Sequence, residues 1–367
     1  MVDAEIALLT SRDILVTPFS RHNDQVNTVS RRQLAADTIW STTVGLEFES
    51  AIRRTEPDVI HIHNTFPLIS PSIYWVASRL RLPVVQTLHN FRLLCPQAMF
   101  LRQGLVCEDC LGKVPWRGAI RGCYRDSVIQ STVLTSMLTL HRAIGTWQNK
   151  ITRYIALNEF CRNKFIEGGL PAERIVIKPN FVDFAAPVSA VRHGFLFVGR
   201  LSAEKGIDVL SRAASAASGI SIRVAGTGPQ ADLLTQAPEI SLLGALSTDA
   251  VRAEMSQAMA LVLPSIWYEN FPRTLVEAFA CGLPVIASRI GALADLVQDG
   301  INGLLFDAGS SQDLAEKMNW AQQHPTEMAQ MGRNARAHYE AEFTAERNYQ
   351  QLMAIYEDAI AEVKSGN

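Results

Sequence analysis

The feature that most constrains this fold is a regular alternation of short, β-branched apolar runs with longer amphipathic or alanine-rich stretches. Short apolar strands that alternate with helices are typical of parallel sheets covered by helices. The sequence therefore predicts an α/β protein. The expected strands are residues 14–17, 59–63, 84–88, 154–157, 195–198, 221–225, 240–243, 261–263, 284–287 and 304–306.

The length of 367 residues is enough for two domains, and the charge is distributed unevenly. The whole chain has 34 Lys and Arg against 36 Asp and Glu, which argues against a uniformly basic nucleic-acid-binding protein. Residues 1–185 carry a net charge of +5 and residues 186–367 carry −7, while the window 79–153 carries +8. Halves of opposite sign indicate two domains with different partners.

A turn-rich stretch near residues 178–193 predicts the domain boundary. We expect an N-terminal Rossmann-like domain over residues 1–185, with a cysteine-rich insertion at 95–123. A second domain is expected over residues 186–343. A last helix at 344–363 is expected to cross back to the first domain.

The chain has no basic, apolar leader at its first residues and no run of 18 apolar residues. Its six cysteines are too few for a secreted disulfide scaffold. We therefore expect a cytoplasmic protein.

The strongest motif is Glu269, seven residues, then Glu277, followed by a Gly-Leu-Pro-Val stretch. The expected strand 261–263 leads into a loop that carries Glu269, and a helix should start near Pro272. Loops at the carboxyl ends of parallel strands bind ligands, and a helix N-terminus attracts anions. The alternative is a pair of surface glutamates. The candidate ligand-binding backbone at this helix start is Asn270, Phe271, Pro272, Thr274 and Leu275.

A second loop follows the expected strand 195–198. Gly199 lets a ligand approach the backbone, because it has no side chain. Arg200 and Lys205 flank the loop and could neutralise a departing diphosphate, although ordinary solvated cations would look the same. The Gly-Thr-Gly-Pro turn at 226–229 is a weaker signal, because two glycines alone are common.

Together these motifs resemble the retaining glycosyltransferases of the GT-B fold, family 4 type. The resemblance covers nearly the whole chain and implies two doubly wound Rossmann-like domains that face a cleft. It places Glu269 at the transferred sugar, Glu277 at the nucleotide ribose, and Arg200 and Lys205 at the diphosphate. It implies a nucleotide diphosphate sugar as donor substrate and no required cofactor. No Asp-x-Asp sequence occurs to hold a metal.

His89 ends the expected strand 84–88, and the resemblance places a histidine there near the donor sugar. A structural, hydrogen-bonded histidine is the alternative. His61 and His63 alternate along the strand 59–63, so they share one face. We assign them no role.

Four cysteines in the insertion have the spacing C-x11-C-x2-C-x12-C: Cys95, Cys107, Cys110 and Cys123. Such thiols could hold a structural zinc ion, but the usual second C-x2-C pair is absent. Thiols that order a loop, or labile disulfides, are the favoured alternatives. We expect no metal site.

Arginine and aromatic residues interleave at 116–125, directly before the apolar stretch 128–140. This pattern suits an anionic membrane surface, but also RNA or a solvated loop over a core helix. The resemblance favours a membrane, because many such transferases extend lipid-linked glycans. The family also opens with a strand and a Gly-Gly loop, whereas this sequence begins at the expected following helix, residues 3–12.

The sequence thus predicts transfer of a sugar from a nucleotide diphosphate sugar to an acceptor hydroxyl, with retention of configuration. The expected acceptor is a lipid-linked or polysaccharide glycan, and no nucleic acid is expected as partner. A non-catalytic glycan- or lipid-binding homologue, a truncated fragment, and a nucleotide-sugar epimerase are the alternatives.

Overall fold

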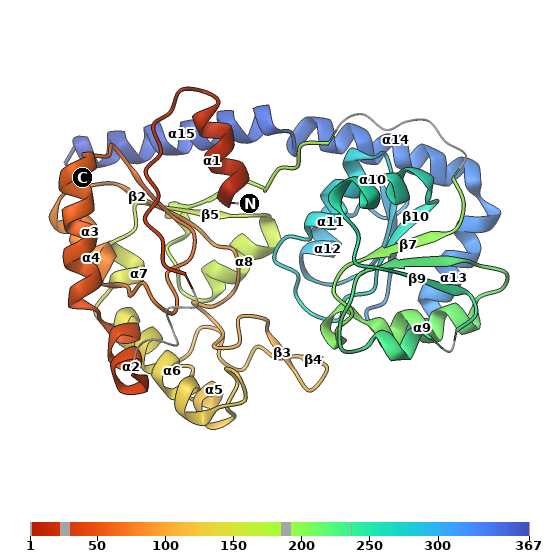
Figure 1. Ribbon diagram of the computed structural model, residues 1–367, viewed down its shortest axis with the longest axis horizontal. Coiled ribbons are helices and arrows are strands. Elements are labelled where there is room, and N and C mark those ends of the chain that lie inside the picture. Colours follow the sequence, from red (N-terminus) through yellow and green to blue (C-terminus); the bar gives the residue numbers. More distant parts are fainter. Residues whose placement is uncertain (1, 23–29, 185–191, 236, 367) are drawn as a thin grey trace. The chain divides into compact units, whose positions relative to one another are not determined.

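The computed structural model describes residues 2–22, 30–184, 192–235 and 237–366. The chain folds into two compact units (Figure 1). Unit 1 comprises Met1–Phe100, Glu108–Lys178 and Tyr349–Asn367, and unit 2 comprises Leu101–Cys107 and Pro179–Asn348. The predicted domain boundary at 185/186 lies outside the described residues.

Unit 1 is built on a four-stranded sheet in the order β1-β2-β5-β6, and every pair is parallel. The strand order follows the chain order, so successive connections advance in one direction across the sheet. The strands are β1 (Ile60–Ile62), β2 (Val84–Thr87), β5 (Arg153–Ala156) and β6 (Ile175–Ile177). The helices are α1 (Val2–Thr10), α2 (Arg31–Ile39), α3 (Thr42–Thr55), α4 (Ser72–Arg79), α5 (Trp116–Ile120), α6 (Val128–Ala143), α7 (Thr146–Asn149), α8 (Glu159–Glu167) and α15 (Ala345–Lys364), whose last part belongs to this unit.

Both faces of this sheet are covered by helices, because its strands point side chains to alternate sides. Val85 and Ile155 pack against α1 and α15 on one face, where Leu9 and Leu352 complete the cluster. On the other face, the Tyr74 hydroxyl of α4 donates to Gln86 at 3.0 Å. All four residues of the central strand β2 are buried, and its polar Gln86 is satisfied by this hydrogen bond.

The strand expected at 14–17 is wrong, because these residues have no strand partner. Ile14 and Val16 pack against the α1/α15 cluster, while Leu15 is 90% exposed. The alternating pattern therefore reflects one-sided burial of an extended segment. The other expected strands are present, with ends that differ by at most one residue.

Unit 2 contains a six-stranded parallel sheet in the order β12-β11-β10-β7-β8-β9. The first strand in the chain, β7, lies near the middle of the sheet, and β8 and β9 follow on one side of it. The chain then returns, and β10, β11 and β12 follow on the other side. This is a doubly wound sheet, with its switch point between β7 and β10. The strands are β7 (Phe195–Val198), β8 (Ile222–Ala225), β9 (Ile240–Gly244), β10 (Ala260–Leu263), β11 (Val285–Ser288) and β12 (Gly303–Phe306).

Two apolar clusters fill the two faces of this sheet. The helices of unit 2 are α9 (Ile207–Ala216), α10 (Thr248–Gln257), α11 (Arg273–Ala280), α12 (Gly291–Leu296), α13 (Ser311–Gln323) and α14 (Pro325–Glu342). Inside the insertion, β3 (Leu101–Arg102) and β4 (Leu105–Val106) form a small antiparallel hairpin. In the described part of the chain, no helix is both long and apolar enough to span a bilayer.

Candidate active site

The switch point of unit 2 gathers the two motifs that the sequence singled out. Strands β7 and β10 are direct neighbours, with Ala260 opposite Phe195. The chain therefore leaves both strands at the same edge of the sheet, and the loops that follow carry Gly199 to Lys205 and Pro264 to Pro272. In doubly wound sheets, ligands bind at this position.

Gly206 allows these two loops to touch. It has a φ of +70°, and a Cβ at this position would lie 1.9 Å from the carbonyl oxygen of Pro264. A side chain is excluded both by the left-handed backbone and by this close approach. The Ile266 N–H also donates to the Glu204 carbonyl at 3.0 Å. These backbone contacts fix Lys205 beside the loop that carries Glu269.

Glu269 and Lys205 form an ion pair at this junction. Lys205 Nζ lies 2.5 Å from Glu269 Oε1, and the Ser265 hydroxyl donates to the same oxygen at 2.8 Å. Glu269 is only 6% exposed, so its charge needs these partners. The ammonium also lies 5.4 Å from the centre of the Trp267 ring. The pair is a carboxylate and a cation held at a strand end, with Lys205 partly open to solvent.

Helix α11 starts directly after this loop, with Pro272 as its N-cap. Its buried Glu277 accepts from Arg273 Nε at 2.8 Å. Burial raises the pKa of Glu277, and the neighbouring Arg273 opposes that shift. The carboxylate therefore lies about one turn from the helix start, as the motif predicted.

The remaining predicted residues of this loop have different surroundings. Asn270 and Pro272 are buried, and Thr274 is partly exposed. Phe271 packs against the core, with its ring 6.1 Å from that of Phe343. Leu275 is fully buried in the same core, and its N–H donates to the Pro272 carbonyl. The structure thus gives the Leu275 side chain a packing position.

A cavity of about 490 Å³ opens at the carboxyl ends of β7, β8 and β9. Gly199 and the exposed Arg200 line it, together with the Gly-Thr-Gly-Pro turn. A Cβ on Gly226 would lie 1.8 Å from the Gly199 carbonyl oxygen, so this cavity wall requires glycine. Sequence reasoning missed the wall formed by Ala245, Leu246 and Val251, whose only signal is that they follow β9.

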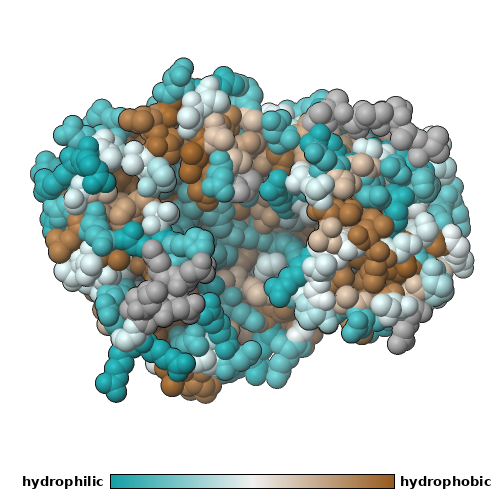
Figure 2. Space-filling model, in the orientation of Figure 1, coloured by the Kyte–Doolittle hydropathy of each residue, from teal (hydrophilic) through white to brown (hydrophobic). Residues whose placement is uncertain are grey.

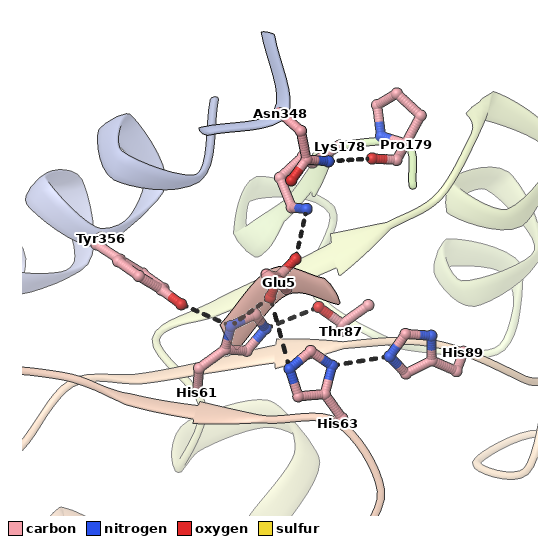
Figure 3. A network of polar contacts seen from close by, with 9 residues as sticks. All are labelled: Glu5, His61, His63, Thr87, His89, Lys178, Pro179, Asn348 and Tyr356. Atoms are coloured by element: carbon pink, nitrogen blue, oxygen red, sulfur yellow. Dashed lines mark hydrogen bonds and ion pairs between the residues drawn. The ribbon is translucent and has the colours of Figure 1, made fainter. Parts of the chain in front are cut away.

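His89 lies in unit 1, where it joins a network of polar contacts (Figure 3). Its Nε2 lies 2.8 Å from His63 Nδ1. His61 Nδ1 lies 2.7 Å from the Tyr356 hydroxyl, and His61 Nε2 lies 2.8 Å from the Thr87 hydroxyl. Burial lowers the pKa of all three histidines, that of His89 to about 4. All three imidazoles are therefore neutral at pH 7.

Two charged residues that sequence reasoning missed complete this network. Lys178 Nζ lies 3.0 Å from Glu5 Oε2, and both side chains are almost fully buried. Glu5 Oε1 lies 3.3 Å from His61 Nδ1 and 3.5 Å from His63 Nε2. In the sequence, the only indication of a buried Glu5 is that a charged residue lies on the apolar face of an expected helix. No neighbouring residue in the sequence indicates that Lys178 is buried.

The described residues contain one group of three or more metal-type ligands that converge: Glu5, His61 and His63. The four insertion cysteines do not form such a group among these residues. The histidine group does not fit a metal ion well, because Lys178 neutralises Glu5 and both His61 nitrogens have hydroxyl partners. We therefore assign no metal ligand.

Comparisons with known proteins identify the family. The model described as Glycosyltransferase Family 4 matches residues 9–186, and that described as Glycosyl transferases group 1 matches residues 191–338. An uncharacterized glycosyltransferase of Methanocaldococcus jannaschii is 31% identical over 257 residues, which cover 65% of this chain and 72% of the relative. The chain therefore belongs to the group 1, family 4 glycosyltransferases.

More distant relatives agree with this assignment. A D-inositol 3-phosphate glycosyltransferase of Mycolicibacterium smegmatis is 27% identical over 84% of this chain and 69% of its own length. Among solved structures, Anabaena HepE in complex with UDP has a TM-score of 0.66 at 20% identity, covering 95% of this chain and 88% of HepE. Sucrose-phosphate synthase from Thermosynechococcus elongatus has the same TM-score and identity, covering 91% and 81%. The predicted GT-B fold class is confirmed.

Proposed function

We propose that this glycosyltransferase moves a sugar from a nucleotide diphosphate sugar to an acceptor hydroxyl with retention of anomeric configuration. The observation that carries this proposal is the Lys205–Glu269 ion pair at the switch point of unit 2. It combines a cation suited to a leaving diphosphate with a carboxylate suited to sugar hydroxyls. Anabaena HepE, which shares the fold, was solved with UDP and with UDP-glucose.

The diphosphate, base, ribose and sugar of the donor would each contact a different region of the site. The diphosphate would lie near Arg200, Lys205 and the start of α11, where positive charge and helix N–H groups favour an anion. The nucleotide base would enter the cavity lined by Gly199 and the Gly-Thr-Gly-Pro turn. Glu277 would accept hydrogen bonds from the ribose, and Glu269 from the transferred sugar.

The reaction itself needs no side-chain nucleophile. The bond between the anomeric carbon and the diphosphate oxygen breaks, and a bond to the acceptor oxygen forms on the same face. The acceptor proton moves to the departing diphosphate, whose charge Lys205 and Arg200 stabilise. We propose that no metal is required, which an assay after exhaustive chelation tests. The assignment of His89 to the transferred sugar stays a prediction.

A donor panel tests the function directly. The full chain is incubated with UDP-, GDP- and ADP-sugars, with and without glycan or lipid-linked acceptors. Product requiring acceptor, with the donor's anomeric configuration in its NMR spectrum, supports the proposal. An epimerised nucleotide sugar formed without acceptor supports the epimerase. Donor binding without turnover across the panel supports a non-catalytic homologue.

We further propose that the acceptor is lipid-linked and that unit 1 docks on the cytoplasmic face of an anionic membrane. Large apolar side chains are exposed at both ends of α5 and at the start of α6, and Figure 2 shows apolar surface in this region. They include Ile129, which is 79% exposed, and Trp116, Ile120 and Val128. We name these four side chains the apolar tip. Amphipathic surfaces flanked by Arg bind anionic lipid interfaces.

We expect the arginines of this segment to contribute unequally to the proposed attraction. Arg117 and Arg121 both pair with Asp109, so the charge of this pair of cations is partly compensated. The guanidinium carbon of Arg125 lies 5.3 Å from the centre of the Tyr124 ring. We therefore expect the apolar tip to contribute most of the binding and Arg125 to provide the salt-sensitive part.

Vesicle sedimentation tests the membrane proposal. Binding to anionic vesicles should fall in an Ile120→Ser, Ile129→Ser variant and persist in a Leu46→Ser control, which changes an exposed apolar residue of α3. Salt should weaken wild-type binding more than that of Arg125→Glu. Equal binding to neutral vesicles, or none to anionic ones, contradicts the proposal. Binding to RNA instead would support the other interpretation of this basic segment.

A further inference from the structure

We propose that Glu5 acts as a positioning residue that fixes the tautomer of His89. Through His63, it keeps the His89 proton on Nε2, so that Nδ1 is left as a hydrogen-bond acceptor for a hydroxyl of the sugar substrate. This inference rests on the proposed function for the identity of the ligand. The tautomer itself follows from contacts within unit 1 (Figure 3).

The first step is the charge on Glu5. Lys178 Nζ lies 3.0 Å from Glu5 Oε2, and the exposed fractions of the two side chains are 1% and 6%. A buried ammonium and a buried carboxylate stabilise each other's charged forms, because either alone would be strongly desolvated. Burial lowers the pKa of Lys178, and Glu5 opposes that shift. In this buried ion pair, Glu5 is the carboxylate partner of the Lys178 ammonium, and a carboxylate can only accept hydrogen bonds.

The second step is the orientation of the His63 proton. Glu5 Oε1 is buried without a hydrogen-bond donor and lies 3.5 Å from His63 Nε2. A lone pair on Nε2 would face the carboxylate unfavourably, so the proton lies on Nε2. A neutral imidazole has only one N–H, and His63 is neutral because burial lowers its pKa. His63 Nδ1 is consequently an acceptor.

The third step is that the acceptor state of His63 Nδ1 determines the tautomer of His89. His63 Nδ1 and His89 Nε2 lie 2.8 Å apart, and the two rings stack with centroids separated by 5.1 Å. Since His63 Nδ1 accepts, His89 Nε2 must donate. His89 is itself neutral, so its Nδ1 carries the lone pair.

The other polar groups around this path do not reverse it. His61 is the remaining imidazole beside Glu5, and its two nitrogens contact the hydroxyls of Tyr356 and Thr87. Both hydroxyls can donate or accept, so they adapt to either His61 tautomer. Burial raises the pKa of Tyr356, which keeps this hydroxyl protonated. The direction of the path is therefore determined by the one ionised acceptor, Glu5.

The test is histidine-selective ¹⁵N NMR on the full chain at pH 7, which distinguishes protonated from unprotonated ring nitrogens. A His89→Gln spectrum assigns the signals. Wild-type protein should show His89 with Nε2 protonated and Nδ1 bare. In Glu5→Gln, the amide oxygen should face Lys178 and its NH₂ should donate to His63, which reverses both tautomers. Thr87→Val, which alters only the His61 branch, should leave the His89 tautomer unchanged.

His63→Phe provides a second variant should Glu5→Gln fail to fold, and here His89 should populate both tautomers. On donor and acceptor, Glu5→Gln should lower kcat about tenfold, the value of one hydrogen bond, with donor KM nearly unchanged. Wild-type His89 protonated at Nδ1, or a Glu5→Gln protein with the wild-type tautomer, overturns the inference. A correct tautomer in a protein without transferase activity would instead contradict the proposed function alone.

Discussion

The two units bring polar side chains to the carboxyl ends of their parallel strands, but the chemistry at the two ends differs. In unit 2, Lys205 and Glu269 form an ion pair whose cation is partly exposed. In unit 1, the only charged pair of the histidine network, Glu5 and Lys178, is buried, and the histidines are neutral. The comparison indicates that unit 2 is built to compensate charge and unit 1 to orient uncharged hydrogen-bonding groups.

The largest effect is expected from removing charge in unit 2. Lys205→Ala should lower kcat by about 10²–10³, because a cation beside a departing diphosphate stabilises the transition state. Glu269→Gln and Arg200→Ala should each also lose most turnover while the protein stays folded. Steady-state kinetics with circular dichroism measures both properties.

Arg212→Ala is the matched control for these variants, because Arg212 pairs with Asp208 on the exposed surface of α9. Its kinetics should equal those of the wild type. If Lys205→Ala retains normal kcat/KM, unit 2 does not use this cation and the comparison between the two units fails.

The next effect concerns the contact that assembles the site of unit 2. Gly206→Ala forces a side chain into a left-handed backbone, which costs about 1–2 kcal/mol, and adds a clash with the Pro264 carbonyl. We expect a clear loss of stability on chemical denaturation. Gly219→Ala shares the positive φ but has open space around its Cβ, so it should cost less. Equal losses would mean that the close approach to Pro264 is unimportant.

A smaller effect is expected at Glu277. Glu277→Ala should raise the KM for the nucleotide sugar about tenfold, as expected for one or two hydrogen bonds to a charged acceptor, with little change in kcat. Arg273→Ala, which removes only the partner of that carboxylate, should have a weaker effect. Donor affinity measured by calorimetry checks the assignment, and an unchanged value in Glu277→Ala would exclude a ribose contact.

The last prediction concerns the pH dependence of stability, in which each histidine contributes a small part. Burial lowers the pKa of four histidines of unit 1 and one of unit 2 among the described residues: His61, His63, His89, His141 and His338. Their unfolded pKa is about 6.5, so the unfolded state binds more protons as the pH falls below that value. Stability should therefore fall as the pH drops below about 6.5. Each histidine contributes up to about 1.4 kcal/mol per pH unit until the pH reaches its own folded pKa, which is about 4 for His89.

Hydrogen exchange followed at pH 7, 6 and 5 should locate this loss in unit 1 before unit 2. His89→Asn should flatten the dependence, because one titrating group is removed. A stability curve that is flat over this range, or one that first affects unit 2, would remove the distinction between the two units.

Much of the fold could be predicted because the relevant signals are local. Buried parallel strands are typically short and apolar, so β7 and β10 can be recognised from their own residues. The segment 14–17 is similarly short and mostly apolar, yet it has no partner strand. The β-propensity of a residue describes how well its side chain fits a pleated sheet. Whether a segment pairs as a strand depends instead on which other strand lies next to it in the folded protein.

The sequence by itself determined the motif residues of unit 2, because a Glu, a Gly or a Lys must follow its strand within a few residues to reach the sheet edge. Only the tertiary structure decided that Gly206 touches Pro264 and thereby joins Lys205 to Glu269. Only the structure likewise joined Glu5, His63 and Lys178, which are far apart in the chain. The physical reason is that burial and charge compensation depend on distance in space, which local sequence does not encode.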